Sequence, residues 1–227
     1  MSGPRSVILA IDTTSEFGSL ALAHGAEVDE IVPVRSRAGF AHLIFQEIIA
    51  LLDRHGLNLG DVGGYAAASG PGSFTGVRVG LTAAKGLAEA HGKRVAPVSN
   101  LAALAYSGEG ECRAPLIDAR RGEIYGAVYD AALRPVVEEM AAPLPRFLEK
   151  LGNLPVTFVA SDFTPFRAGI SGTRFETARM VTAPRALAGA VAAVAARLFE
   201  EGRALLPEQV DANYIRRSDA ELLWKET

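Results

Sequence analysis

The sequence contains very little cysteine and no apolar stretch long enough to cross a membrane. Cys112 is the only cysteine among 227 residues, which excludes internal disulfides and a cysteine metal cluster. The most apolar window, residues 186–199, is rich in Ala and Gly and falls short of the roughly 20 residues that span a bilayer. We interpret it as a buried helix. The apolar run 7–11 stops at Asp12, which indicates a strand rather than a signal peptide, and the cytoplasm is the expected compartment.

Excess positive charge is also lacking. The chain has 23 Lys and Arg against 26 Asp and Glu, for a formal net charge of −3. Proteins that hold nucleic acid on their own are usually basic. A stand-alone nucleic-acid binder is therefore disfavoured, and we expect any such role to be shared with a partner.

Histidine and serine patterns give no support for metal or hydrolytic chemistry. The four histidines are His24, His42, His55 and His91, and no pair has the i, i+4 spacing of a helical metal site. We expect surface or helix-end histidines. A Gly-x-Ser-x-Gly elbow is missing as well, so a hydrolytic triad has no support.

The pattern of the first half predicts strands and helices in a recognisable order. Three strands come first, followed by helix, strand, helix, strand and helix, in residues 7–11, 19–23, 27–34, 40–55, 65–69, 77–90, 94–98 and 100–106. This is the order of one lobe of the actin-like ATPase fold, which is an analogy of fold and says little about function.

The second half echoes the first with less helix. A linker at 108–110 precedes a hairpin (115–119 and 124–129), and then a strand (136–140), a helix (145–151), a strand (156–160) and the helix at 186–199, with Pro184 at its first position. We predict an α/β, two-lobed, actin-like ATPase (ASKHA, ribonuclease H-like) fold with a degenerate second lobe. The predicted boundaries are 1–107 for the first lobe, 108–206 for the second and 207–227 for a C-terminal tail, with helix 184–201 a candidate for packing back toward the first lobe.

The glycine-rich loop from Gly70 to Gly76 opens a helix. Its glycines permit close backbone approach, its Ser73 and Thr75 can cap the helix, and such helix starts suit anions. It is not a P-loop, because Val77-Arg78 replaces the Gly-Lys-Ser/Thr ending. A tight turn and an anion site both stay open. The possible anion- or nucleotide-binding residues are Asp12, Thr13, Gly70, Gly72, Ser73, Gly76 and Arg78.

Two further charged features have alternative interpretations. Asp12 ends the first strand and could hold a hydrated Mg²⁺ in a phosphotransferase, but no second carboxylate is evident, so a turn capped by Asp12 is favoured. At the hairpin tip, Arg120 and Arg121 could meet a phosphate or a partner's carboxylate, and Asp118 is a partner-contact candidate beside them. A solvated turn is favoured there.

The two long helices of the first lobe are candidates for a subunit interface. Phe45 and Ile49 widen the apolar stripe of the first helix beyond that of an ordinary surface helix, and the second helix has a surface of small residues. Tight packing inside the lobe and docking of a partner can both hold. The predicted interface residues are Phe40, Leu43, Ile44, Glu47, Thr75, Val79, Gly80, Ala83, Ala84 and Leu87. Gly80→Arg or Ala84→Arg is expected to weaken docking by steric clash.

Several stretches together resemble the TsaB (YeaZ) family over nearly the whole chain. They are Leu-Ala-Ile-Asp-Thr-Thr at 9–14, Ser-Gly-Pro-Gly-Ser-Phe-Thr-Gly-Val-Arg at 69–78, Val-Ser-Asn-Leu-Ala at 98–102, Ile-Asp-Ala-Arg-Arg-Gly-Glu-Ile-Tyr at 117–125 and Tyr-Ile-Arg at 214–216. The glycine loop combined with the Asp-Ala-Arg-Arg-Gly-Glu hairpin is specific, whereas either alone is not. The segment at Ser36-Arg37 also matches, but Gly39-Phe-Ala-His42 departs from the family's pattern.

The resemblance implies a role in forming N6-threonylcarbamoyladenosine (t6A) in tRNA, beside the anticodon. It implies a non-catalytic subunit without cofactor that pairs through first-lobe helices with the catalytic subunit TsaD. TsaE joins that pair, TsaC supplies the threonylcarbamoyl-adenylate, tRNA is met through the complex, and a homodimer can form through the same helices. Catalytic relatives hold a metal with paired helical histidines, but His42 is followed four residues later by Gln46, so no metal site is expected.

Other functions stay open as alternatives. A small actin-like ATPase or kinase would use Asp12 and the glycine loop and would need a second nucleotide loop, for which residues 169–172 are the one glycine-rich candidate. An M22-type glycoprotease, a label this family has carried, is disfavoured by the missing metal pair and triad. A stand-alone tRNA binder is disfavoured by the net charge.

Overall fold

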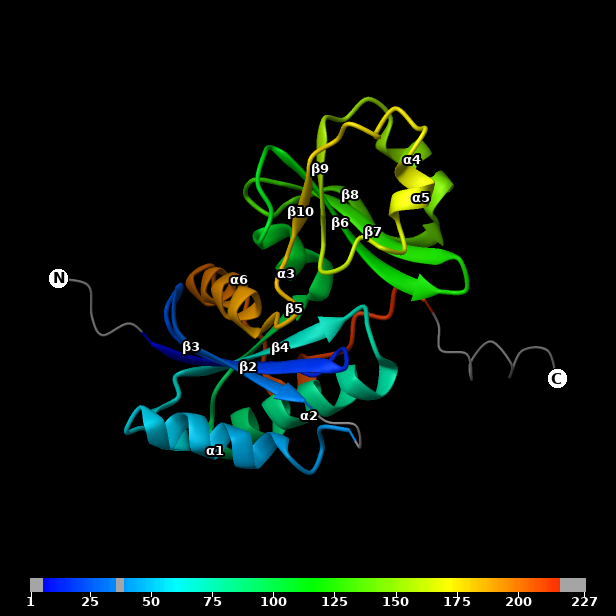
Figure 1. Cartoon of the computed structure of the whole chain (residues 1–227). Coiled ribbons are helices and arrows are strands. Elements are labelled where there is room, and N and C mark those ends of the chain that lie inside the picture. Colours follow the sequence, from blue (N-terminus) through cyan, green and yellow to red (C-terminus); the bar gives the residue numbers. More distant parts are fainter. Residues whose placement is uncertain (1–5, 36–38, 217–227) are drawn as a thin grey trace. The chain divides into compact units, whose positions relative to one another are not determined.

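The computed structural model describes residues 6–35 and 39–216. The Ser36-Arg37 match and residues 217–227 of the predicted tail lie outside these ranges. The chain divides into two compact units. Unit 1 comprises Met1–Asn100 and Ala186–Asn213, and unit 2 comprises Leu101–Arg185 and Tyr214–Thr227. Each unit contains one five-stranded sheet (Figure 1).

These units divide the chain at other positions than the predicted boundaries at 107/108 and 206/207. Residues 101–107 fall in unit 2, and residues 186–213 return to unit 1. The return has a physical basis, because helix α6 (Ala188–Glu200) packs on all five strands of the unit 1 sheet. The chain then pairs Leu205 with Val95 at the sheet edge.

The sheet of unit 1 combines an antiparallel meander with parallel strands. Its order is β3-β2-β1-β4-β5, with bounds β1 Val7–Asp12, β2 Phe17–His24, β3 Glu27–Arg35, β4 Gly64–Gly70 and β5 Val95–Ser99. β1 pairs antiparallel with β2 and parallel with β4. β4 is buried along its whole length, as expected for a central strand covered on both faces. The predicted strands of the first half are confirmed to within a few residues.

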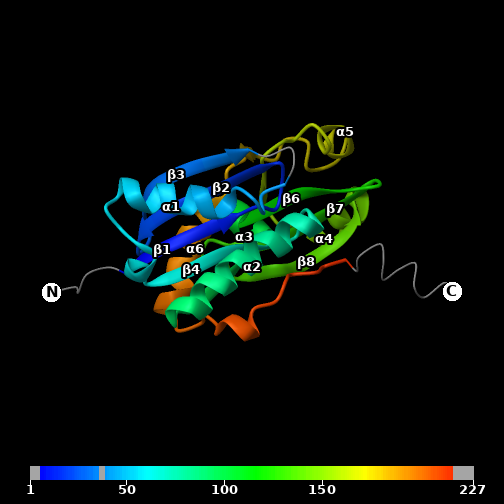
Figure 2. The same ribbon diagram turned by 90° about the horizontal axis from the view of Figure 1, so that it is seen from below.

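Helices cover both faces of this sheet. α1 (Ile44–Arg54) and α2 (Phe74–His91) lie side by side on one face, and α6 lies on the other (Figures 1 and 2). The short 3₁₀ helices are η1 (Leu59–Asp61) and η2 (Pro207–Gln209). Small residues let the layers approach, since a Cβ at Gly64 would lie 2.4 Å from the Phe199 ring.

Two predicted helix starts are wrong. The first helix begins at Ile44 rather than residue 40, because 41–43 form a turn and the Phe40 ring packs against Gly18. Pro184 is not the first residue of α6, which starts at Ala188. There the Ser19 hydroxyl accepts a hydrogen bond of 3.1 Å from the Ala188 amide, satisfying a donor at the helix end from a neighbouring strand.

Unit 2 repeats the strand plan of unit 1. Its order is β10-β9-β6-β7-β8, in which β8, β7, β6, β9 and β10 take the places of β3, β2, β1, β4 and β5. The elements are α3 Asn100–Tyr106, β6 Cys112–Arg120, β7 Glu123–Asp130, β8 Pro135–Pro143, α4 Leu144–Leu151, β9 Val156–Ala160, α5 Arg167–Ile170 and β10 Met180–Thr182.

The second unit is the poorer in helix, as predicted. α4 has 8 residues and α5 has 4, against 11 in α1 and 18 in α2. Its core is aromatic, with an edge-to-face contact between Phe158 and Phe175.

The predicted two-lobed actin-like α/β fold is confirmed. No helix within the described ranges has the length and apolar character to span a membrane.

Candidate functional site

Asp12 ends β1 inside unit 1, with 1% of its surface exposed. Its Oδ1 accepts hydrogen bonds from the Thr14 amide (2.9 Å) and the Thr14 hydroxyl (2.6 Å). Burial raises the pKa of Asp12 above its ordinary value, although the two contacts with Thr14 and the Leu187 amide lower it. Oδ2 is buried and has no hydrogen-bond partner of normal geometry among the described residues, so the Leu187 amide acts on the carboxyl only weakly. The expected capping role of Asp12 is thus filled by one oxygen, and the other is unsatisfied.

A buried polar chain continues from Thr14. The Thr14 hydroxyl accepts a short hydrogen bond from the side-chain amide of Asn100 at the start of α3. The side-chain Oδ1 of Asn100 in turn accepts a hydrogen bond from the amide of Gly70 at 3.0 Å. Asn100 therefore ties the end of β1 to the end of β4. Sequence reasoning missed this residue as a site member, although it lies in the Val-Ser-Asn stretch that carried the family resemblance.

The glycine loop packs directly on the Asp12–Thr14 turn. The Thr13 hydroxyl donates to the Gly76 carbonyl oxygen at 2.6 Å, and the Ser73 amide donates to the Thr14 carbonyl oxygen at 2.7 Å. A Cβ at Gly76 would lie 1.9 Å from the Thr13 carbonyl oxygen, and one at Gly72 would lie 2.7 Å from that of Thr14. The structure thus brings the predicted residues together, and the glycines are required by close backbone contact.

Three amides of the glycine loop are occupied by internal contacts. The Gly70 amide donates to the Asn100 side chain, and the Ser73 amide donates to the Thr14 carbonyl oxygen. The Gly76 amide donates at 3.3 Å to the hydroxyl of Ser73, which is the N-cap residue of α2. The Arg78 guanidinium stacks over the Phe74 ring, 3.7 Å from its centroid. This geometry favours the tight-turn interpretation, and an anion site stays a prediction.

Most of the predicted interface residues lie in the core of unit 1. Phe40, Ile44, Gly80, Ala83, Ala84 and Leu87 are buried, Leu43, Glu47 and Val79 are half-buried, and Thr75 is exposed. A Cβ at Gly80 would meet the Thr13 hydroxyl at 2.7 Å. Arginine at Gly80 or Ala84 would therefore disrupt the core before it affected docking. Of the predicted set, only Leu43, Glu47, Val79 and Thr75 keep surface that a partner could reach.

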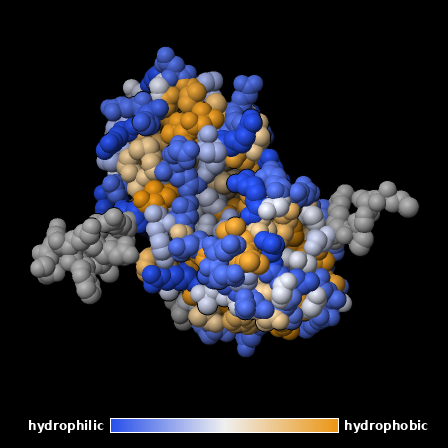
Figure 3. Space-filling model, turned by 180° about the vertical axis from the view of Figure 1, so that it is seen from behind, coloured by the Kyte–Doolittle hydropathy of each residue, from blue (hydrophilic) through white to orange (hydrophobic). Residues whose placement is uncertain are grey.

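One exposed apolar surface of unit 1 is the outer face of α1, which we define by Phe45 and Ile49. These side chains are 51% and 45% exposed and lie one helical turn apart, whereas the inward stripe with Ile48 is buried. Among the described residues, α1 is the one helix with two exposed large hydrophobic side chains. Exposed apolar surface is not confined to α1, because the face of the molecule shown in Figure 3 has several separate hydrophobic patches among hydrophilic residues. The signal was present in the sequence as an unusually wide apolar stripe.

The predicted partner-contact residues form the β6–β7 hairpin tip in unit 2. Arg120 and Arg121 adopt positive φ values of 64° and 56°. The Asp118 carboxylate accepts a 2.8 Å hydrogen bond from the Arg120 amide and lies 3.4 Å from its guanidinium. The Arg120 side chain is 85% exposed. The turn is therefore solvated, as expected, but its backbone conformation is unusual for arginine.

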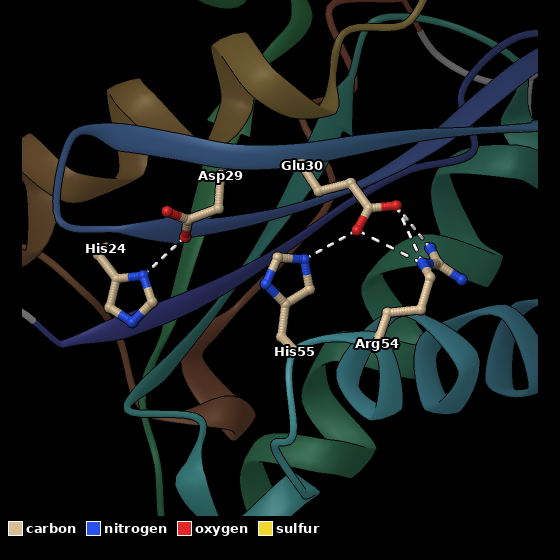
Figure 4. Close-up of polar contacts among 5 residues, drawn as sticks. All are labelled: His24, Asp29, Glu30, Arg54 and His55. Atoms are coloured by element: carbon tan, nitrogen blue, oxygen red, sulfur yellow. Dashed lines mark hydrogen bonds and ion pairs between the residues drawn. The ribbon is translucent and has the colours of Figure 1, made fainter.

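Two of the histidines bind carboxylates on β3 (Figure 4). His24 lies 2.6 Å from Asp29, while Glu30 joins His55 (2.8 Å) and Arg54 (2.8 Å) at the end of α1. Hydrogen bonds from Arg54 and then His55 lower the pKa of Glu30. His42 lies exposed in the turn before α1. Within residues 6–35 and 39–216, no three His, Cys, Asp or Glu side chains are grouped to hold a metal ion.

The fold and this site define a two-unit actin-like α/β protein whose glycine loop is packed on the first strand. The family model described as "TsaD: tRNA N6-adenosine threonylcarbamoyltransferase" matches residues 22–207. The Bacillus subtilis protein named "tRNA threonylcarbamoyladenosine biosynthesis protein TsaB" is 32% identical over 162 residues, 68% of this chain and 71% of that protein. The Haemophilus influenzae protein of the same name is 39% identical over 122 residues. That match covers 52% of this chain and about half (51%) of the relative's length.

A solved structure extends the likeness to the whole fold. The structure titled "YeaZ from Pseudomonas aeruginosa" has a TM-score of 0.74 and 28% identity, covering 92% of this chain and 99% of that one. This chain therefore belongs to the family that the model describes and, within it, to the TsaB (YeaZ) proteins.

Proposed function

We propose that this chain is a non-catalytic subunit in the formation of t6A in tRNA, and that it pairs with a TsaD through α1. The names of the TsaB relatives and the match to the TsaD family model support the pathway. The observation that carries the pairing is the outer face of α1. The same chain would act in the cytoplasm beside TsaE and TsaC, and would meet tRNA within the complex.

The outer face of α1 has the character of a protein interface. Phe45 and Ile49 together expose apolar side chains on a helix that is already anchored by a buried stripe, including Ile48. Aromatic and aliphatic anchors near the centre of a contact supply most of its binding energy. Leu43, Val79 and Thr75, from the predicted interface set, retain exposed surface and would extend the contact.

The polar chemistry of unit 1 supports a non-catalytic role. Asp12 is sealed from solvent, and Thr14 saturates one of its carboxylate oxygens. The amides of Gly70, Ser73 and Gly76 donate within the protein, where a phosphate-binding loop would direct such groups at its ligand. We therefore interpret the glycine loop as a turn inherited from a nucleotide-binding fold, which now positions the start of α2.

Light scattering after size-exclusion chromatography tests the pairing. The chain is mixed with purified TsaD at micromolar concentration, and the mass of the eluting species is measured. We expect a one-to-one heterodimer. The variant F45S/I49S, whose changes are on the surface, should elute as separate proteins with unchanged circular dichroism. A homodimer that uses the same face should give way to the heterodimer as TsaD is added. No heterodimer with the native chain would refute the pairing.

One observation favours a second candidate, an actin-like ATPase or kinase. Asp12 Oδ2 is buried without a partner, which is costly in a purely structural turn. Measurement of phosphate release from ATP by the purified chain decides this. Hydrolysis that disappears in D12N would establish it, and no hydrolysis above that of D12N would dismiss it.

A further inference from the structure

The hairpin tip between β6 and β7 combines arginine with a backbone conformation that arginine disfavours. Arg120 and Arg121 have φ values of 64° and 56°, and Gly122 follows at 79°. Positive φ brings Cβ close to the backbone, so Gly, Asn and Asp usually occupy such turn positions. The fold needs a tight turn here, and asparagine or glycine at positions 120 and 121 would form it with less strain.

Side-chain contacts of the flanking residues Asp118 and Glu123 nevertheless hold the turn in place. Asp118 accepts the Arg120 amide at 2.8 Å, which fixes the bend. The next carboxylate along the chain, Glu123, accepts from the Arg216 guanidinium at 3.1 Å. Arg216 belongs to the Tyr-Ile-Arg stretch near the end of the described chain, and its neighbour Ile215 packs against the Leu101 cluster. The two family stretches at 117–125 and 214–216 therefore form one structural element.

This arrangement directs positive charge outward. Arg216 engages Glu123 at the base of the hairpin, and the Asp118 carboxylate lies 3.4 Å from Arg120 while the Arg120 side chain stays 85% exposed. Arg121 is exposed as well. In a chain with a net charge of −3, two adjacent exposed arginines in a strained turn point to a role in binding an anion.

The chemistry of the tip favours phosphate over a protein surface. A guanidinium presents a planar fork that matches phosphate oxygens. Residues 118–123 include no exposed large hydrophobic side chain, whereas protein interfaces rely on such anchors. We infer that Arg120 and Arg121 bind phosphodiester groups of RNA, and this inference rests on the proposed function in tRNA modification. Two contacts are too few to hold RNA alone, so the tip adds to binding by an assembly.

Salt-dependent tRNA binding tests the inference. The complex of this chain with TsaD is titrated against an unmodified tRNA transcript by fluorescence anisotropy between 50 and 200 mM NaCl. In R120N/R121G, loss of two phosphate contacts should reduce the slope of log K against log salt by roughly 1.4 to 1.8, from about 0.7 to 0.9 per contact. The melting temperature of the variant should rise, because asparagine and glycine adopt positive φ with less strain than arginine. If the arginines had a purely structural role, the melting temperature of the variant would fall instead.

R134A is the matched control, since Arg134 is 79% exposed and lies in another turn of the same sheet, paired with Asp130. It should leave the slope unchanged. An unchanged slope in R120N/R121G would overturn the inference, as would loss of TsaD binding with normal tRNA binding, which would mark a protein contact. If the native chain does not pair with TsaD, the proposed function fails separately. In that case, the same tRNA titration at low salt compares the isolated native chain with R120N/R121G, and weaker binding by the variant measures the contribution of the two arginines.

Discussion

The Thr13 hydroxyl at the end of β1 donates a 2.6 Å hydrogen bond to the carbonyl oxygen of Gly76, 63 residues further along the chain. This bond joins the first strand to the first turn of α2, and it is buried. It is possible because residue 76 has no side chain, so the two backbones meet. The glycine loop is thus a packing device that sets where α2 begins.

Replacing Gly76 by alanine tests this packing. Its Cβ would lie 1.9 Å from the Thr13 carbonyl oxygen, so the backbone must move. We expect Gly76→Ala to lower the free energy of unfolding by about 2 to 3 kcal/mol. Gly86→Ala is the control in the same helix, because no atom lies within 4 Å of that Cβ. It should raise stability by about 0.5 to 1 kcal/mol. Equal urea midpoints for the two variants would contradict the packing role.

The buried carboxyl of Asp12 predicts a pH dependence. Burial raises its folded-state pKa above the ordinary value of 3.8, so the native state holds the proton more tightly than the unfolded chain. The resulting stabilisation is complete below pH 3.8 and is lost as pH rises through the folded-state pKa. Each unit of elevation corresponds to about 1.4 kcal/mol.

The variant Asp12→Asn isolates this effect, because it has no proton to lose. The free energy of unfolding of the native chain, minus that of Asp12→Asn, should fall as pH rises from 3.8 through the folded-state pKa, and then level off. Urea titrations at a series of pH values measure it. Parallel pH profiles for the two proteins would show that Asp12 is not perturbed.

Glu30 predicts the opposite trend at the end of α1. Its pKa lies below the ordinary value of 4.5 because Arg54 and His55 donate hydrogen bonds to its carboxylate. The stabilisation from the contacts of Glu30 with Arg54 and His55 is therefore present above pH 4.5, and it is lost as pH falls through the lower folded-state pKa. Glu30→Ala should speed hydrogen exchange in the last turn of α1 at neutral pH, relative to native. Identical protection of residues 51–54 in both proteins would show that these contacts have no role.

The outer face of α1 predicts that binding and stability can be separated. Phe45→Ser and Ile49→Ser change exposed side chains, so they should weaken TsaD binding at least tenfold in calorimetry with little change in melting temperature. Ile48→Ala, in the buried stripe of the same helix, should instead lower the free energy of unfolding by about 2 to 4 kcal/mol. Unchanged affinity in both serine variants would remove α1 from the interface.

Hydrophobic periodicity predicted the elements whose patterns are local. The strands at β1 and β4 and the helix α2 emerged within a few residues, because buried runs and glycine punctuation mark them. The start of α1 was missed because the apolar Phe40 extends the helical pattern, although its ring packs against Gly18 instead. The three-residue strand β10 and the four-residue helix α5 are too short to show a period.

The site was predictable in its parts and less so in its surfaces. The Asp12 turn and the glycine loop were singled out and do meet, because both follow neighbouring parallel strands. Burial could not be read from residue type, so Gly80 and Ala84 were assigned to an interface although Thr13 and the core cover them. Asn100 was missed because a single amide has no spacing pattern, and its role depends on three segments meeting.

Reconstitution of t6A formation tests the central claim most directly. Purified TsaD, TsaE and TsaC are incubated with ATP, threonine, bicarbonate and an unmodified tRNA transcript, with and without this chain, and the nucleosides are quantified by mass spectrometry. The account predicts t6A only when the chain is added, a yield near background with F45S/I49S, and no product from the chain without TsaD. Full t6A formation in the absence of the chain, or product from the chain without TsaD, would contradict it.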